Sequence, residues 1–304
     1  MEPSIQKPFS IIYNEENNFV EMKSVERIPF EPKGWKLQMR EELKANIRKI
    51  IPDKNKILYA AYCDNASVPQ KFDLENILFY NIGTSNFSSF ASNGIIFETN
   101  PYPVEGPLFD ETNYNYYYKY MLIKPKESSS FWEPDEKINQ FEIKINEPFK
   151  TSYKPEFFWL NTKLAKISTF KTPTEYNFLG LKLLIYGPEN SKVNLTSFIK
   201  TLIDGIISAF SYLPQNPDPG LVTILKEKTG ESERLLSNLL GSKENAVLGA
   251  HNVLHFFNNK KSIQWNPQDD KLLFTKVTYK NSEQLNNWCI KGELFTIKIK
   301  EDPR

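Results

Sequence analysis

Cysteine and histidine are scarce in this chain, with two of each among 304 residues. Cys63 and Cys289 cannot build a disulfide framework, and both follow aromatic residues, which predicts small buried side chains. His251 and His255 are four residues apart, but Asn252 stands where the HExxH motif of zinc proteases has its general base. We therefore expect ordinary packing of both rings and no metal site of Cys or His ligands.

Glycine is also sparse, with 12 residues in the whole chain. No Walker or Rossmann glycine pattern and no serine elbow is present, which disfavours nucleotide hydrolysis. Charge of one sign is not in excess either, because 38 Lys and Arg face 37 Asp and Glu. A net charge of +1 supplies no long-range field for a polyanion, so any contact with nucleic acid needs a local patch.

Long apolar runs are absent as well. The most apolar stretch, residues 195–213, is interrupted by Lys200 and Asp204, which is typical of an amphipathic helix and not of a membrane span. The first twenty residues carry scattered charges and prolines without the apolar centre of a signal peptide. We therefore expect no membrane partner and a cytoplasmic location.

Aromatic residues, in contrast, are abundant: 22 Phe, 15 Tyr and 5 Trp supply material for a large core. The residue patterns predict an α+β fold with mixed or antiparallel sheets and packed helices. The chain is long enough for two lobes, a strand-rich N-terminal lobe over residues 1–150 and a C-terminal lobe over 151–304. Residues 77–83 and 183–187 both place an apolar stretch with a Tyr before a Gly, so either the lobes are related or the likeness is chance.

The expected elements follow from apolar periodicity and from turn residues. Helices are expected at 36–51, 194–212, 232–240 and 243–257. Strands are expected at 57–63, 77–82, 114–124, 141–145, 181–186, 262–265, 271–279 and 293–300. The clearest element is the helix at 194–212, with Asn194 as its N-cap and a broad apolar face of Leu195, Ile199, Leu202, Ile206 and Phe210.

Tyrosines are concentrated at residues 114–124. In a strand, Tyr116, Tyr118 and Tyr120 would share one face and could stack against the bases of a single-stranded nucleic acid. The alternative is a half-buried strand whose hydroxyl groups reach water.

Carboxylates form the remaining candidate constellation. Lys200 and Asp204 are four residues apart on the polar side of the expected helix, and Asp269 and Asp270 precede a strand. We expect Asp204 to be exposed, ionised and paired with Lys200, and the two later aspartates to cap a turn.

These residues carry a resemblance to a known family. The stretches NLTSFIKTLIDGIISA (194–209) and QWNPQDDKLLFTKV (264–277) resemble the RusA family of Holliday-junction resolvases, over less than half of the chain. The resemblance implies a helix with a Lys-x-x-x-Asp pair and an Asp-x-Asp-Asn run whose carboxylates hold Mg²⁺. Here residues 191–194 read Ser-Lys-Val-Asn, so two carboxylates are replaced, and the resemblance favours a relative of the same fold that has lost catalysis. Asp73-Leu-Glu75-Asn76 echoes the run elsewhere, but a strand is expected after it.

Three functions remain open. The leading interpretation is a non-catalytic protein without a cofactor that acts through a protein partner, which could be an accessory component of a bacterial assembly. The alternative is a metal-dependent nuclease or nucleic-acid processing enzyme that uses Asp204, Asp269, Asp270 and Lys200 with Mg²⁺. The third is a single-stranded nucleic-acid binder that uses the tyrosines at 116, 118 and 120.

Overall fold

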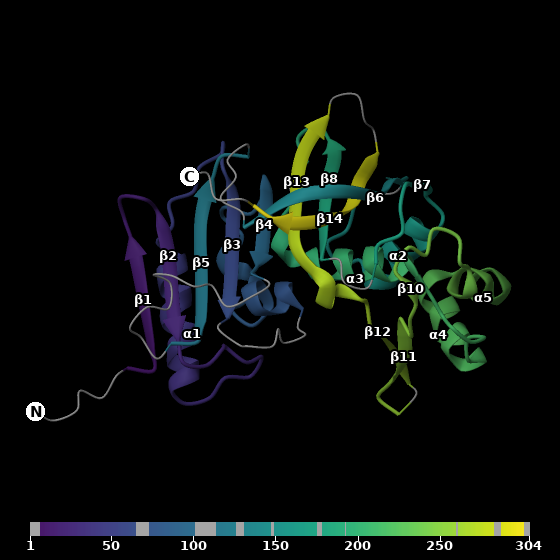
Figure 1. Ribbon diagram of the computed structural model, residues 1–304, viewed down its shortest axis with the longest axis horizontal. Helices are drawn as coiled ribbons and strands as arrows, with labels where there is room; N and C mark the ends of the chain where they lie inside the picture. Colours follow the sequence, from purple (N-terminus) through teal and green to yellow (C-terminus); the bar gives the residue numbers. More distant parts are fainter. Residues whose placement is uncertain are drawn as a thin grey trace, which may run out of the picture.

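A single ten-stranded sheet runs through the molecule, in the order β1-β2-β5-β3-β4-β13-β8-β14-β6-β7 (Figure 1). The computed structural model describes residues 7–64, 73–100, 114–125, 131–146, 149–174, 178–191, 193–259, 261–282 and 287–300. Neighbouring strands are parallel in the pairs β3/β4 and β8/β13, and the other pairs of this sheet are antiparallel. The mixed sheet with packed helices confirms the expected α+β class.

The elements have the following bounds. The strands of the large sheet are β1 (Phe9–Asn14), β2 (Phe19–Ser24), β3 (Ile57–Asp64), β4 (Gly94–Thr99), β5 (Tyr116–Ile123), β6 (Trp132–Ile145), β7 (Lys166–Thr169), β8 (Leu179–Pro188), β13 (Leu272–Ser282) and β14 (Trp288–Ile299). Two small ladders pair β9 (Ser211–Tyr212) with β10 (Gly249–Ala250), and β11 (Leu254–Phe257) with β12 (Ser262–Trp265). The helices are α1 (Trp35–Ile47), α2 (Pro155–Lys163), α3 (Ile199–Ala209), α4 (Pro219–Thr229) and α5 (Glu233–Gly241), with short turns η1 (Asn76–Tyr80), η2 (Thr84–Phe87), η3 (Leu195–Ser197) and η4 (Asp269–Lys271).

Strands from both halves of the sequence are hydrogen-bonded to one another. β4 of the first half pairs with β13 of the second, and β6, also from the first half, lies between β14 and β7. The largest apolar cluster likewise draws on both halves, from Val20 to Leu294. The boundary near residue 150 stays a prediction, and the pairing makes the sheet continuous across it.

One face of the sheet is covered by α3. On β8, Leu181, Leu183 and Ile185 are buried in the same apolar cluster as α3, and the residues between them point to the other face, since side chains alternate along a strand. In the view of Figure 1, α3 runs behind β13 and β8. The five apolar residues expected to be buried, which include Leu202, are all fully buried, so the predicted apolar face is confirmed.

The end of α3 nearer the N-terminus differs from the expectation. Helical geometry is continuous only from Ile199, after the separate turn η3, and the Asn194 side chain makes no capping hydrogen bond. Instead, the Asn194 side-chain oxygen accepts a hydrogen bond from the Thr196 hydroxyl at 2.8 Å. Asn194 therefore makes a local contact with Thr196 and does not cap the helix α3.

Two expected elements are wrong in type. Residues 77–82 are not a strand, because Asn76–Tyr80 forms a π-helical turn, and residues 243–257 are not a helix, because they contain the strands β10 and β11. A short apolar run does not by itself distinguish a strand from a buried helical turn. Residues 77–83 and 183–187 therefore differ in structure, since the first segment forms a helical turn and the second lies in the strand β8.

The helix α4 was not expected, because prolines are frequent just before it and at its first position. Pro219 stands at the first position of α4, where the missing amide hydrogen costs nothing, and the Asp218 carboxylate accepts a hydrogen bond from the Gly220 amide. Toward the other end of the large sheet, β6 begins at Trp132, well before the strand expected at 141–145.

The two cysteines are buried, as expected. Within the described ranges, no helix is both long and apolar enough to cross a membrane.

Candidate metal centre

Four carboxylates and one ammonium group meet beneath the sheet, from three segments far apart in the sequence. Asp73 and Glu75 stand at the start of η1, Lys200 and Asp204 lie one turn apart on α3, and Asp269 opens η4, just before β13. The local structure of η1 explains the position of its acids. The Asp73 carbonyl accepts hydrogen bonds from the Asn76 and Ile77 amides, which turns the chain directly after Asp73.

Lys200 contacts three of the four carboxylates of this cluster. Its Nζ donates to Asp73 Oδ2 at 2.8 Å, to Glu75 Oε1 at 3.2 Å and to Asp204 Oδ1 at 3.2 Å. Three donors on one ammonium group thus contact three carboxylates. The Asn76 side-chain amide adds a hydrogen bond to Asp73 Oδ2 at 2.6 Å.

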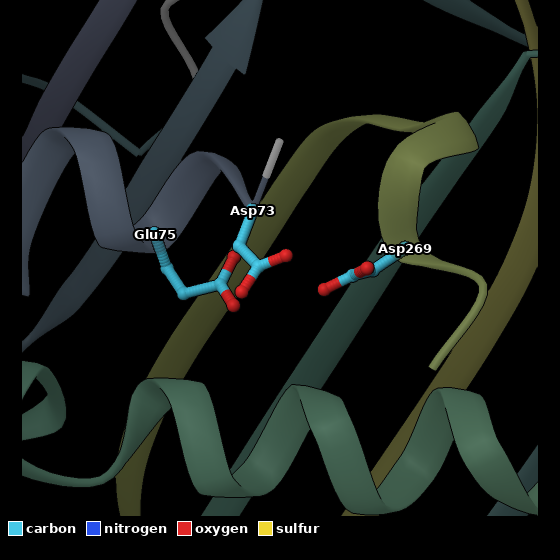
Figure 2. A group of neighbouring side chains, drawn as sticks. All are labelled: Asp73, Glu75 and Asp269. Atoms are coloured by element: carbon cyan, nitrogen blue, oxygen red, sulfur yellow. The ribbon is translucent and has the colours of Figure 1, made fainter. Parts of the chain in front are cut away.

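Asp269 faces the same cluster without a contact to the lysine. Its side chain points toward Asp73 and Glu75 in Figure 2, and the residue is only 9% exposed. Its Oδ2 atom is buried and has no hydrogen-bond partner in the described part of the chain. A buried polar atom without a partner costs free energy, about 1 to 3 kcal/mol for a neutral group and more for a charged one. The arrangement therefore leaves an oxygen free to accept a ligand or a proton.

Asp73, Glu75 and Asp269 have the geometry of a metal-binding group. Each offers one carboxylate oxygen, and these oxygens all lie within 4.8 Å of one another (Figure 2). Oxygen ligands lie about 2.0 to 2.6 Å from Mg²⁺ or Ca²⁺, so ligands of one ion are separated by up to about 5 Å. The three carboxylates can therefore reach one divalent cation.

Burial and mutual repulsion change the acidity of the cluster. Burial first, and then the charges of Glu75, Asp73 and Asp204, raise the pKa of Asp269 to about 9. Burial also raises the pKa of Asp204 to about 7, against the opposing effect of Lys200, and it raises the pKa of Glu75. The pKa of Lys200 is raised, because the three carboxylates outweigh the effect of its own burial. Without a further cation, the cluster therefore retains protons at neutral pH.

The expectation for Asp204 is corrected in one respect. Asp204 is paired with Lys200 as expected, but it is only 7% exposed, and its pKa is raised instead of remaining ordinary. The reason is tertiary: η1 and the segment that precedes β13 cover the side of α3 that looks polar in the sequence. Asp269 is likewise buried, although it does open a short turn.

The structure brings Lys200, Asp204 and Asp269 together, but of the three expected aspartates only Asp269 belongs to the group of possible ligands, and Asp204 and Asp270 lie outside it. Asp73 and Glu75 stand in this group where Asp204 and Asp270 were expected. The Asp73-Leu-Glu75-Asn76 run in the sequence pointed to these two acids. Because a strand was expected after the run, its contact with the Lys200 side of α3 was not predicted. Of the run at 191–194, Lys192 lies outside the described residues, so its side chain has no structural description.

The tyrosines of β5 are positioned for packing. Tyr118 and Tyr120 are fully buried, and the Tyr120 hydroxyl donates to the Leu78 carbonyl oxygen at 3.0 Å. A base needs an exposed ring face for stacking, which these two residues do not offer. Tyr116 is half-buried and stacks at 6.3 Å on Tyr62.

The histidines occupy separate environments. His255 lies in β11, and the His251 ring nitrogen Nε2 is 2.9 Å from the Asn266 carbonyl oxygen. Neither belongs to a group of possible metal ligands among the described residues.

Comparisons with family models, with curated proteins and with solved structures found no match to this chain.

Proposed function

We propose that this protein binds a divalent cation, Mg²⁺ or Mn²⁺, at Asp73, Glu75 and Asp269 and uses it to hydrolyse phosphodiester bonds. The observation that carries the proposal is the buried Asp269 carboxylate, which faces two other carboxylates with an unpartnered oxygen. Oxygen ligands of this type are those that Mg²⁺ prefers in proteins.

Charge balance supports a cation at this place. With all groups ionised, four carboxylates face the single ammonium of Lys200, so the cluster holds three uncompensated negative charges. Isolated buried charges are costly, and an unfilled cluster reduces that cost by binding protons. A divalent cation would neutralise two charges and displace the proton from Asp269.

The residues around the cation would have distinct roles. A bound cation supplies an activated water molecule and neutralises charge on the phosphate. Asp204 has a pKa of about 7, which suits a group that accepts a proton near neutral pH. Lys200 remains positively charged and holds the carboxylates in place through its three contacts.

The resemblance to RusA-like resolvases supplies the substrate class. The family has a carboxylate run that ends in Asn directly ahead of a Lys-x-x-x-Asp helix. Here the helix pair is Lys200 with Asp204, and the similar run Asp73–Asn76 lies far upstream in the sequence instead of directly ahead of α3. These segments are in direct contact through Lys200 Nζ. We therefore propose nucleic acid, and branched DNA first, as the substrate.

The test is cleavage of branched and single-stranded DNA in the presence of Mg²⁺ or Mn²⁺. We expect cleavage by the wild type, a loss of at least about a hundredfold in Asp269→Asn and Asp204→Asn, and near wild-type activity in Asp270→Asn. Calorimetric titration with Mn²⁺ reports on the ion separately: Asp269→Asn should weaken binding, and Asp270→Asn should not. Equal binding of Mn²⁺ by both variants would contradict the metal site, and cleavage that survives Asp269→Asn would contradict its catalytic role.

The second candidate is a non-catalytic cytoplasmic protein that binds a protein partner, such as another component of a bacterial assembly. Exposed apolar side chains at the β1 edge of the sheet favour it, since Ile12 of β1 and Ile51, which hydrogen-bonds to Asn18 after β1, are 57% and 61% exposed. The β1 edge is free of a neighbouring strand in the described part of the molecule, and such an edge can accept a strand from a partner. Failure of the wild type to bind Mn²⁺ or to cleave any of the DNA substrates would favour this candidate.

A further inference from the structure

Three lysines surround an open cavity on the face of the sheet opposite α3. Lys276 of β13, Lys182 of β8 and Lys291 of β14 line a cavity of about 350 Å³, together with Thr278, Gln140 and one acidic residue, Glu293. Volumes of about 300 to 1,000 Å³ are usual for small-molecule sites. The cavity is remote from the carboxylate cluster, because Lys182 alternates with Leu181 and Leu183, which face α3.

The sheet register forces two of these positive charges together. Lys276 and Lys182 are direct partners in the parallel pair β13/β8, and Lys291 is the partner of Leu184, two residues further along β8. Like charges directly opposite one another on a sheet destabilise it. The sequence thus places two lysines side by side in the middle of the sheet.

The nearby carboxylates do not neutralise this pair. Glu293 is the partner of Lys182 across β14/β8, but its carboxylate forms an ion pair with Lys137 at 3.1 Å. Glu142 likewise pairs with Lys291 at 3.4 Å. Within the described ranges, neither Lys182 nor Lys276 has a carboxylate within ion-pair distance.

Neutral groups hold the two ammonium groups in place. Lys276 Nζ donates to the Pro125 carbonyl oxygen at 2.9 Å, and Lys182 Nζ lies 4.6 Å from the centre of the Phe295 ring. Burial and the charge of Lys182 lower the pKa of Lys276, as expected for a positive charge without a counterion. Each ammonium group keeps donors for a further acceptor, since an ammonium has three.

We propose that this cavity binds the phosphate group of a small phosphorylated molecule, with Lys182 and Lys276 as its primary ligands and Lys291 at its rim. A phosphate carries between one and two negative charges at neutral pH and offers several acceptor oxygens. It would convert the repulsive pair of lysines into two charge-assisted contacts. The Thr278 hydroxyl and the Gln140 amide line the same cavity and suit the polar remainder of the ligand.

The test is isothermal titration of inorganic phosphate and pyrophosphate into the full chain, with chloride as the only other anion. We expect binding by the wild type and a loss of at least about tenfold in affinity in Lys182→Gln and in Lys276→Gln. The matched control is Lys226→Gln, which removes an exposed lysine of α4 that pairs with Glu233, and its affinity should be unchanged. No heat of binding at millimolar phosphate, or an equal loss in Lys226→Gln, would overturn the proposal.

Thermal melts keep the test independent of any change in stability of the variants. Phosphate should raise the melting temperature of the wild type and of Lys226→Gln, because a ligand that binds only the folded state stabilises it. It should not raise the melting temperature of the Lys182→Gln/Lys276→Gln double variant. If the double variant does not fold, the two single variants are compared in its place. A rise of the same size in the wild type and in the lysine-cavity variants would indicate nonspecific anion binding and would overturn the proposal.

Discussion

Asp269 shows how strongly surroundings decide the chemistry of a single side chain. In the sequence it is one of two adjacent aspartates in a polar turn, yet only Asp269 is directed into the cluster of Asp73 and Glu75. Burial and the neighbouring negative charges raise its pKa to about 9, far above the ordinary value of about 4 for aspartate. The folded protein therefore holds a proton at neutral pH that the unfolded chain has released.

This difference makes stability depend on pH. Since the folded state binds more protons than the unfolded state between about pH 4 and pH 9, the free energy of unfolding of the metal-free protein falls as pH rises through this range. Urea unfolding in EDTA should show a loss of about 1 to 3 kcal/mol between pH 7 and pH 9 for the wild type, since one proton contributes about 1.4 kcal/mol per pH unit.

The matched variants locate this effect. Asp269→Asn cannot release the proton, so its unfolding free energy should change much less between pH 7 and pH 9. Asp270→Asn should follow the wild type. Mn²⁺ should stabilise the wild type more at pH 9 than at pH 7, because it competes with the proton for the carboxylate. An Asp269→Asn variant with the same pH dependence as the wild type would contradict the assignment.

At the scale of elements, α3 contributes residues both to the apolar core and to the carboxylate cluster. One side carries the fully buried Leu202 and its apolar neighbours, and another carries Lys200 and Asp204 toward η1. The helix also lies close to α2, since a Cβ added at Gly205 would be 2.5 Å from the Pro155 carbonyl oxygen and 2.7 Å from Phe158 Cβ. The absence of a side chain at Gly205 therefore allows the two helices to approach.

Gly205→Ala tests this close approach. Alanine favours a helix over glycine by about 1 kcal/mol, but the added methyl group would collide with the α2 backbone, so we expect a net loss of about 1 to 3 kcal/mol in the free energy of unfolding. The control is Gly241→Ala at the end of α5, where a Cβ would meet no atom within 4 Å. That variant should be neutral or slightly more stable in urea unfolding. A stabilised Gly205→Ala protein would show that α2 and α3 can separate freely.

Leu202→Ala tests the apolar face of the same helix. A fully buried leucine leaves a cavity when it is truncated, so the free energy of unfolding should fall by about 2 to 5 kcal/mol. Leu37→Ala on α1 is the control, because Leu37 is 40% exposed and should lose less than about 1 kcal/mol. Equal losses measured by chemical denaturation would mean that α3 packs no more tightly than an exposed helix.

At the scale of the whole molecule, the sheet joins segments that the sequence separates. β4 pairs with β13, and the carboxylate cluster draws on residues 73–75, 200–204 and 269. Breaking this sheet at the β4/β13 pair would expose the largest apolar cluster, which contains residues from both sides. Folding of either half alone would therefore leave much of its core uncovered.

We accordingly expect one cooperative unfolding transition. Scanning calorimetry should give a single peak whose calorimetric and van't Hoff enthalpies agree. Two resolved transitions, or a stable fragment of residues 151–304 after limited proteolysis, would instead support independent lobes.

The sequence by itself determined the elements whose patterns are long and consistent. Thirteen residues of α1 and eleven of α3 follow a helical apolar period, and β3, β5, β13 and β14 follow from β-branched and aromatic content. The burial of Leu202 and the pairing of Lys200 with Asp204 were also predictable, because residues three or four apart share a helix face.

Only the tertiary structure brings the residues of the carboxylate cluster together. Nothing local in the sequence places Asp73 and Glu75 against Lys200, since more than a hundred residues separate them and the contact depends on how η1 packs on α3. The same packing buries Asp204 and Asp269, and burial is what changes their acidity. A helical pattern determines which residues share a face, but only the neighbouring elements determine whether that face contacts water or, as here, the carboxylates of Asp73, Glu75 and Asp269.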